Sequence, residues 1–100
     1  MTSFPFKETV LSDWKDGKRE VIREFSVDVD PGELIWHRDR ERRHLTVLES
    51  VGWSFQHENQ LPFDLTPGET IHIAPRSYHR VIKGTGPLVV HVQMYEESEK

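Results

Sequence analysis

The chain is a succession of short apolar runs in which every second side chain is polar, and frequent turn signals separate these runs. Phe25 and Val27, Trp53 and Phe55, and the residues from Val90 to Met94 all follow this period of two. Such alternation places all apolar side chains of a strand on one face. The turn signals are Asp16-Gly17, Pro31-Gly32, Glu58-Asn59, Pro67-Gly68, Ala74-Pro75 and Gly84-Thr85-Gly86-Pro87. We therefore predict strands at 21–29, 33–37, 45–49, 53–57, 62–65, 70–73, 78–83 and 88–95.

No segment keeps the three-to-four spacing of an amphipathic helix over several turns, and 6–14 is the segment that is hardest to assign. Many short strands at regular spacing are typical of an all-β sandwich or barrel. A chain of 100 residues corresponds to one domain. A domain of this size buries roughly two-thirds of its unfolded surface, which is enough for a single modest core.

Composition excludes several classes of function. The formal charge of −4 argues against a broad basic face for nucleic acid, and the basic residues of 38–43 are interleaved with acidic ones. Without cysteine there can be no disulfide, thiolate metal site or cysteine nucleophile. The first residues lack the layout of a signal peptide, and no apolar run is long enough to span a membrane. We expect a soluble, cytoplasmic protein that binds neither nucleic acid nor membrane.

Three residues suggest a metal site. His37 and Asp39 are two positions apart, so on a strand their side chains share a face. His79 follows its own turn signals forty residues after Asp39. Two imidazoles and a carboxylate can hold a divalent metal and leave coordination positions open. In the alternative interpretation these residues are structural. His37 and Asp39 then form a pair on the surface, and His79 is an interior histidine bonded to a backbone carbonyl.

The segment 67–81 resembles the second conserved motif of the cupin family, in which a histidine falls eleven residues after a glycine, as His79 does after Gly68. The segment around His37 is similar to the first cupin motif, with Asp39 where a second histidine usually stands. The resemblance covers roughly 32–92. It implies a small antiparallel β-barrel, that is, a double-stranded β-helix or jelly roll. It also implies a single domain over 1–100, with an N-terminal strand extension at about 1–30 and a barrel core at about 32–95.

This chain departs from the first cupin motif where the family usually has a glutamate. Either Arg43 or His44 falls there, and strand parity cannot choose between them, because loop length sets the register. An inward His44 would give four ligands, whereas an inward Arg43 would weaken metal binding by repulsion. The resemblance implies a divalent Fe, Mn, Ni or Zn ion. The candidate ligands are His37, Asp39, His44 and His79.

For the substrate pocket we expect aromatic walls and an arginine that pairs with an anionic group. The candidates are Arg43, Trp53, Arg76 and Tyr78, with Arg38 and Arg80 as further arginines. The resemblance implies a metal-dependent enzyme acting on a small polar or anionic molecule, of the oxygenase type or the sugar-phosphate isomerase or epimerase type. One alternative is a non-catalytic module that binds a small molecule, with or without metal. A third possibility is an assembly role as a homodimer through N-terminal strands.

Overall fold

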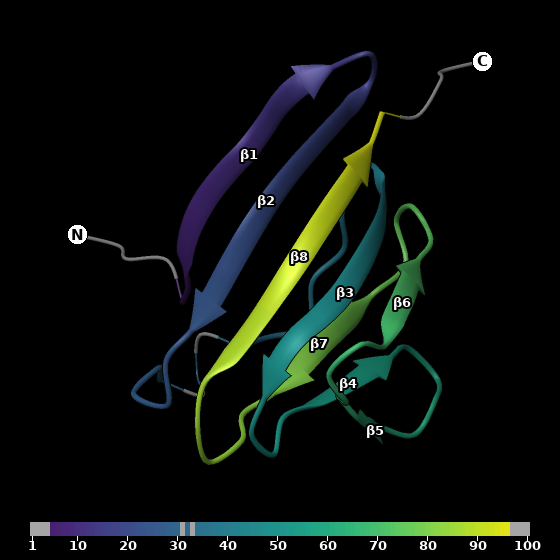
Figure 1. Ribbon diagram of the computed structural model, residues 1–100. Coiled ribbons are helices and arrows are strands. Elements are labelled where there is room, and N and C mark those ends of the chain that lie inside the picture. The colour runs from purple at the N-terminus through teal and green to yellow at the C-terminus, as the bar shows by residue number, and fades with distance from the viewer. Residues whose placement is uncertain (1–4, 31, 33, 97–100) are drawn as a thin grey trace.

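A computed structural model describes residues 5–30, 32 and 34–96, and in this part of the chain all regular structure is β-strand (Figure 1). Nowhere in these residues is there a helix that is long and apolar enough to cross a membrane. The strands are β1 (Lys7–Lys15), β2 (Lys18–Phe25), β3 (Arg42–Ser50), β4 (Ser54–His57), β5 (Phe63–Asp64), β6 (Thr70–Ile73), β7 (His79–Ile82) and β8 (Leu88–Tyr95).

The strands form two antiparallel sheets. The larger sheet has the order β1-β2-β8-β3-β6, and the smaller has the order β5-β4-β7. The last strand, β8, therefore lies in the middle of the larger sheet, between β2 and β3 (Figure 1). This confirms the predicted all-β, antiparallel jelly-roll class, although the two sheets do not close into a continuous barrel.

The strand predictions are correct where alternation is regular, and they fail around residues 26–37. Segments 70–73 and 88–95 form strands with the predicted bounds, and the ambiguous segment 6–14 becomes β1. In contrast, β2 ends at Phe25, and residues 34–37 contain no regular strand, while Glu33 lies outside the described residues. The amide of Asp28 donates to Ser26 Oγ at 3.0 Å, and that of Gly32 donates to Asp30 Oδ1 at 3.0 Å. These local side-chain bonds compete with sheet pairing and turn the chain.

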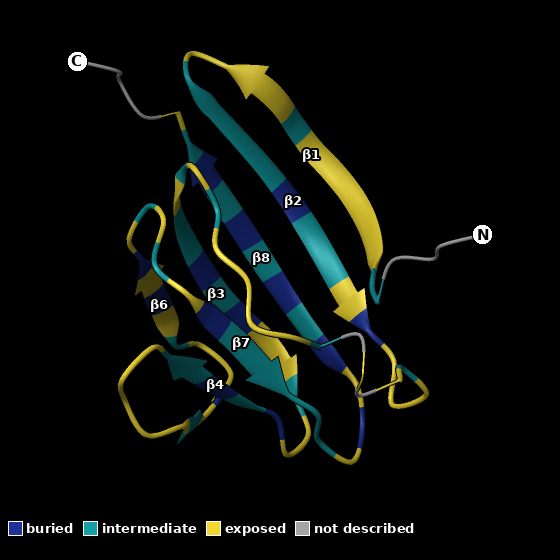
Figure 2. Cartoon of the chain, turned by 180° about the vertical axis from the view of Figure 1, so that it is seen from behind, coloured by how far each residue is buried: buried dark blue, intermediate teal, exposed yellow. Residues whose placement is uncertain are grey.

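The core lies on one face of the larger sheet. Every second residue of β8, from Leu88 to Met94, is at most 2% exposed. The inward residues of β2 and β3 pack beside them, among them Val21 and Val47. Figure 2 shows buried residues alternating with half-buried ones along β8 and within β3. Continuous burial on one face of neighbouring strands fixes their register, since a slip of one residue would turn the apolar side chains outward.

A close contact of two loops holds one end of the sheets together. Trp53 is fully buried, and its indole Nε1 donates to the carbonyl of Gly86 at 2.7 Å. Gly84 lies beneath it with no room for a side chain, because an added Cβ would stand 2.2 Å from the carbonyl oxygen of Val51. Here glycine is required by close backbone approach.

We predict that Gly84→Ala destabilises the protein by at least about 2 kcal/mol, since a methyl group in this position must displace backbone. Gly32→Ala is the matched control, because its Cβ would meet only the Asp30 side chain, at 3.5 Å. This control should stay within about 0.5 kcal/mol of the parent chain. Urea unfolding followed by tryptophan fluorescence measures both. Equal midpoints for the two variants would contradict the packing described here.

Candidate metal centre

A pair of backbone hydrogen bonds brings His37 beside His79. The amide of His37 donates to the carbonyl of His79 at 3.0 Å, and the reverse bond is 2.9 Å. The amide of Arg76 also donates to the carbonyl of Asp39 at 2.6 Å. These bonds attach the irregular segment before β3 to the start of β7. The prediction that His37 and Asp39 lie on a regular strand is therefore wrong, since only an isolated β-bridge forms at His37.

The side chains of His37, Asp39 and His79 nevertheless converge. One potential ligand atom from each lies within 4.8 Å of the others. His79 is buried, Asp39 is partly buried and the side chain of His37 is 51% exposed. The group is thus anchored in the protein on one side and open to solvent on the other.

Both imidazole rings are oriented by backbone carbonyls. Nδ1 of His37 lies 3.2 Å from the carbonyl oxygen of Ile35, and Nδ1 of His79 lies 3.0 Å from that of Ser77. A carbonyl can only accept, so each Nδ1 carries the hydrogen and Nε2 is left to face the site. This second contact of the ring is usual for histidines that bind metals.

The Asp39 carboxylate faces both Nε2 atoms with one oxygen. Oδ2 lies 3.3 Å from Nε2 of His79 and 3.9 Å from Nε2 of His37. It is buried, and no contact to it has hydrogen-bond geometry. Two nitrogen lone pairs and a carboxylate oxygen directed at one another form a donor set that a cation between them would satisfy. The residues therefore fit a divalent metal, and this buried oxygen without a hydrogen bond is the observation that supports the fit.

The pKa shifts favour the protonation states that a metal needs. Partial burial, followed by the nearby His79, lowers the pKa of His37, so this imidazole is neutral near pH 7. Burial alone would raise the pKa of Asp39. The contact with His79 and the charge of Arg43 outweigh it, so that the pKa of Asp39 is lower than usual and the carboxylate is ionised.

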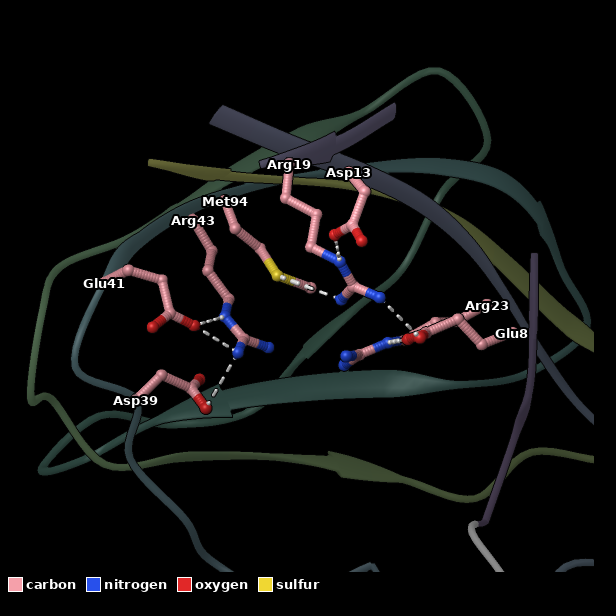
Figure 3. A network of polar contacts seen from close by, with 8 residues as sticks. All are labelled: Glu8, Asp13, Arg19, Arg23, Asp39, Glu41, Arg43 and Met94. Atoms are coloured by element: carbon pink, nitrogen blue, oxygen red, sulfur yellow. Dashed lines mark hydrogen bonds and ion pairs between the residues drawn. The ribbon is translucent and has the colours of Figure 1, made fainter. Parts of the chain in front are cut away.

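Arg43, and not His44, points into the site. On β3, Arg43 shares the inward face with Leu45 and lies 3.3 Å from Asp39 Oδ1, and it also donates to Glu41 (Figure 3). His44 lies on the opposite face of β3, where its ring contacts those of His72 and Tyr95. The expectation of His44 as a fourth ligand is thus corrected by the alternation of side chains along β3.

The three-residue group opens into a cavity of about 390 Å³ between the two sheets. Most of its lining is apolar and comes from both sheets. The polar side chains in the lining are Arg23, His37, Asp39, Arg43 and His79. An apolar cavity with a few converging polar groups is the usual form of a small-molecule site.

Of the four predicted substrate residues, only Arg43 lines this cavity. Trp53 is fully buried in the core, and Tyr78 lies under the guanidinium of Arg38 at 5.2 Å. Arg76 occupies a turn with a φ of 63° and is not among the residues that line the cavity. Arg80 lies over the ring of Trp36, also outside the lining.

Arg23 lines the cavity and is absent from the predicted residues. It stands on β2 between Val21 and Phe25, both of which are buried. A charged residue at an inward position of an alternating strand is therefore the signal in the sequence that could have identified Arg23.

No protein-family model matches the chain, and a search of curated protein sequences finds no match either. Comparison with solved structures does find similar folds. The DMSP lyase DddQ from Ruegeria pomeroyi matches 96% of this chain with a TM-score of 0.75 and 13% identity. This chain covers only 49% of DddQ, about half of its length.

A cupin domain of an XRE family transcriptional regulator from Enterobacter cloacae matches along almost its full length. The match covers 94% of this chain and 99% of that domain, with a TM-score of 0.71 and 15% identity. The structure of FeII HppE matches 89% of this chain, which covers 57% of HppE, with a TM-score of 0.65 and 12% identity. The chain therefore has the fold of cupin domains, as the sequence motifs predicted. At these identities the similarity establishes the fold alone.

We predict that Arg43→Gln destabilises the protein by about 1 to 3 kcal/mol, because it leaves the partly buried Asp39 carboxylate without its cation. Asp39→Asn in the same chain should remove much of this cost, which gives a coupling energy of about 1 kcal/mol or more. Arg40→Gln is the control, since Arg40 is exposed and forms no ion pair with any described residue. Urea unfolding of the parent chain, Arg43→Gln, Asp39→Asn and the double variant measures the cycle, and additive effects would contradict the pairing.

Proposed function

We propose that this chain binds one divalent transition metal through His37, Asp39 and His79 and acts as a metal-dependent enzyme on a small polar or anionic molecule. The observation that carries the proposal is the convergence of two Nε2 atoms and a buried carboxylate oxygen that has no hydrogen bond. The carbonyl contacts of both Nδ1 atoms support it, since they direct the rings.

The donor set suits Fe(II), Mn(II), Ni(II) or Zn(II). Three protein ligands leave positions for water and substrate, and the exposure of His37 gives access to them. When bound, such a metal polarises an oxygen of the substrate, lowers the pKa of bound water or binds O₂. The contact with His79 and the charge of Arg43 lower the pKa of Asp39, and Arg43 holds its other oxygen, which orients the carboxylate toward the histidines.

Among possible reactions we favour the oxygenase type, since two histidines and one carboxylate with open positions are the ligand set of non-haem iron oxygenases. The similarity to FeII HppE agrees with iron in a related fold. An isomerase or epimerase acting on a sugar phosphate is the next choice.

A non-catalytic binding module is the second candidate function. The observation in its favour is Arg43, whose charge competes with a metal for Asp39 and weakens metal binding. The similarity to the cupin domain of a transcriptional regulator also agrees with a binding role. Persistent ligand binding without turnover in the metal-loaded protein would favour this candidate.

We further propose that the chain forms a homodimer through β1. This strand is at the edge of the larger sheet, and it exposes Val10, Leu11 and Trp14. Exposed apolar edge strands readily pair with another chain. Sedimentation velocity at micromolar concentration should show a dimer that Leu11→Lys converts to a monomer. A monomeric parent chain would contradict this proposal.

Metal titration of the chelator-treated protein tests the proposed function. Calorimetry with Ni²⁺ should give one site, and the double variant His37→Ala/His79→Ala should lose affinity by at least about a hundredfold, since two ligands are removed. The matched control is His44→Ala/His72→Ala, which removes two adjacent histidines from the opposite face of the sheet.

The control variant should bind Ni²⁺ like the parent chain, and circular dichroism should show that both variants remain folded. If the parent chain takes up no metal, or if the control variant alone loses it, the proposed ligand set is wrong.

A further inference from the structure

Arg23 enters the cavity from β2 in a fixed orientation. Its Nε donates to Glu8 Oε1 at 2.8 Å, and the ring of Phe6 covers the guanidinium at 4.3 Å. Phe6 in turn packs against Phe25, with ring centroids 5.3 Å apart. Two sides of the guanidinium are therefore occupied by neighbours from β1 and the chain before it.

The two terminal nitrogens of Arg23 have no such partner. Within the described chain, Nη1 and Nη2 donate to no protein oxygen, although the side chain is only 18% exposed. The other two arginines of this network differ, since Arg19 pairs with Glu8 and Asp13, and Arg43 pairs with two carboxylates. Figure 3 shows the free end of Arg23 turned toward the side on which Arg43 lies.

Among the described residues, Glu8 is the one ion-pair partner of Arg23. Burial lowers the pKa of Arg23, the contact with Glu8 raises it, the charge of Arg43 lowers it and the charge of Asp39 raises it. Glu8 is shared between Arg23 and Arg19. A divalent metal at Asp39 would add positive charge. A half-buried guanidinium whose Nη1 and Nη2 donors are free can bind an anionic group.

The shape of the free donors indicates which anion fits. Nη1 and Nη2 form the end of a planar fork, which matches the two oxygens of a carboxylate. The cavity wall beside Arg23 is apolar and includes Phe25, Leu88 and Val90. The ligand thus needs a charged head and an apolar body.

We infer that the cavity binds a small carboxylic acid with an apolar body, and that Nη1 and Nη2 of Arg23 bind its carboxylate. The further step of calling this acid the substrate of the enzyme rests on the proposed function. Binding of the acid itself does not require the metal, so the two can fail separately.

Hexanoate is a suitable probe, with hexan-1-ol and hexylammonium of the same length as controls. Calorimetry on the chelator-treated full chain should show hexanoate binding at least about tenfold tighter than hexan-1-ol, as expected for a charge-assisted pair. Hexylammonium should bind weakest. The chelator-treated form matters because a carboxylate can also bind to a metal directly.

Three variants assign the binding to Arg23. Arg23→Gln should abolish the preference for hexanoate over hexan-1-ol. Glu8→Gln should tighten hexanoate binding, because it removes the anion that competes for the guanidinium. Arg80→Gln, an arginine outside the cavity lining, should change neither. If Arg23→Gln fails to fold because Glu8 keeps only Arg19 as a partner, Glu8→Gln/Arg23→Gln replaces it and should also lack the preference.

Equal binding of hexanoate and hexan-1-ol to the parent chain would overturn the inference, as would a preference that survives loss of Arg23. Looser hexanoate binding in Glu8→Gln would also overturn it. Repeating the titration with Ni²⁺-loaded protein separates the two proposals. A chain that takes up no Ni²⁺ but binds hexanoate through Arg23 would contradict the metal site and support the acid site.

Discussion

The candidate site depends on one backbone bridge, the reciprocal pair of hydrogen bonds between His37 and His79. Residues 34–41 have no strand pairing apart from this bridge. That segment has no regular structure that would fix the position of His37. Its position is set by the hydrogen bonds to His79 at the start of β7. The bridge sets two imidazoles side by side, with ring centroids 4.2 Å apart. The carboxylate of Asp39, two residues after His37, lies 3.3 Å from Nε2 of His79.

Asp39 connects this bridge to the charged network of the larger sheet. One of its oxygens faces the two histidines, and the other lies beside Arg43 on β3. The carboxylate is therefore shared between the proposed metal site and Arg43, and its charge is available in full to neither of them. A metal bound here would share its only anionic ligand with a guanidinium, which favours moderate affinity and an electrophilic metal.

The sequence predicted the fold well because period-two alternation is regular in 70–73 and 88–95, where one face is buried. The resemblance to the two cupin motifs indicated His37, Asp39 and His79 as a group, and their side chains do converge, while metal binding stays a proposal. It did not decide between Arg43 and His44, because the choice depends on how the irregular segment before β3 sets the register. Arg23 was missed because a lone arginine among apolar residues carries no motif. Residues 26–29 were misassigned because the Ser26 hydroxyl accepts from the Asp28 amide and turns the chain, and Asp30 accepts from Gly32 just beyond.

The most direct test of the central claim is anomalous diffraction from crystals of the protein loaded with Ni²⁺ or Zn²⁺. We expect one strong peak about 2.1 Å from Nε2 of His37 and His79, next to an Asp39 oxygen. Arg43 should remain on the other oxygen of that carboxylate. A peak between His44 and His72 on the opposite face of the sheet, or no peak near Asp39, would contradict this assignment of the site.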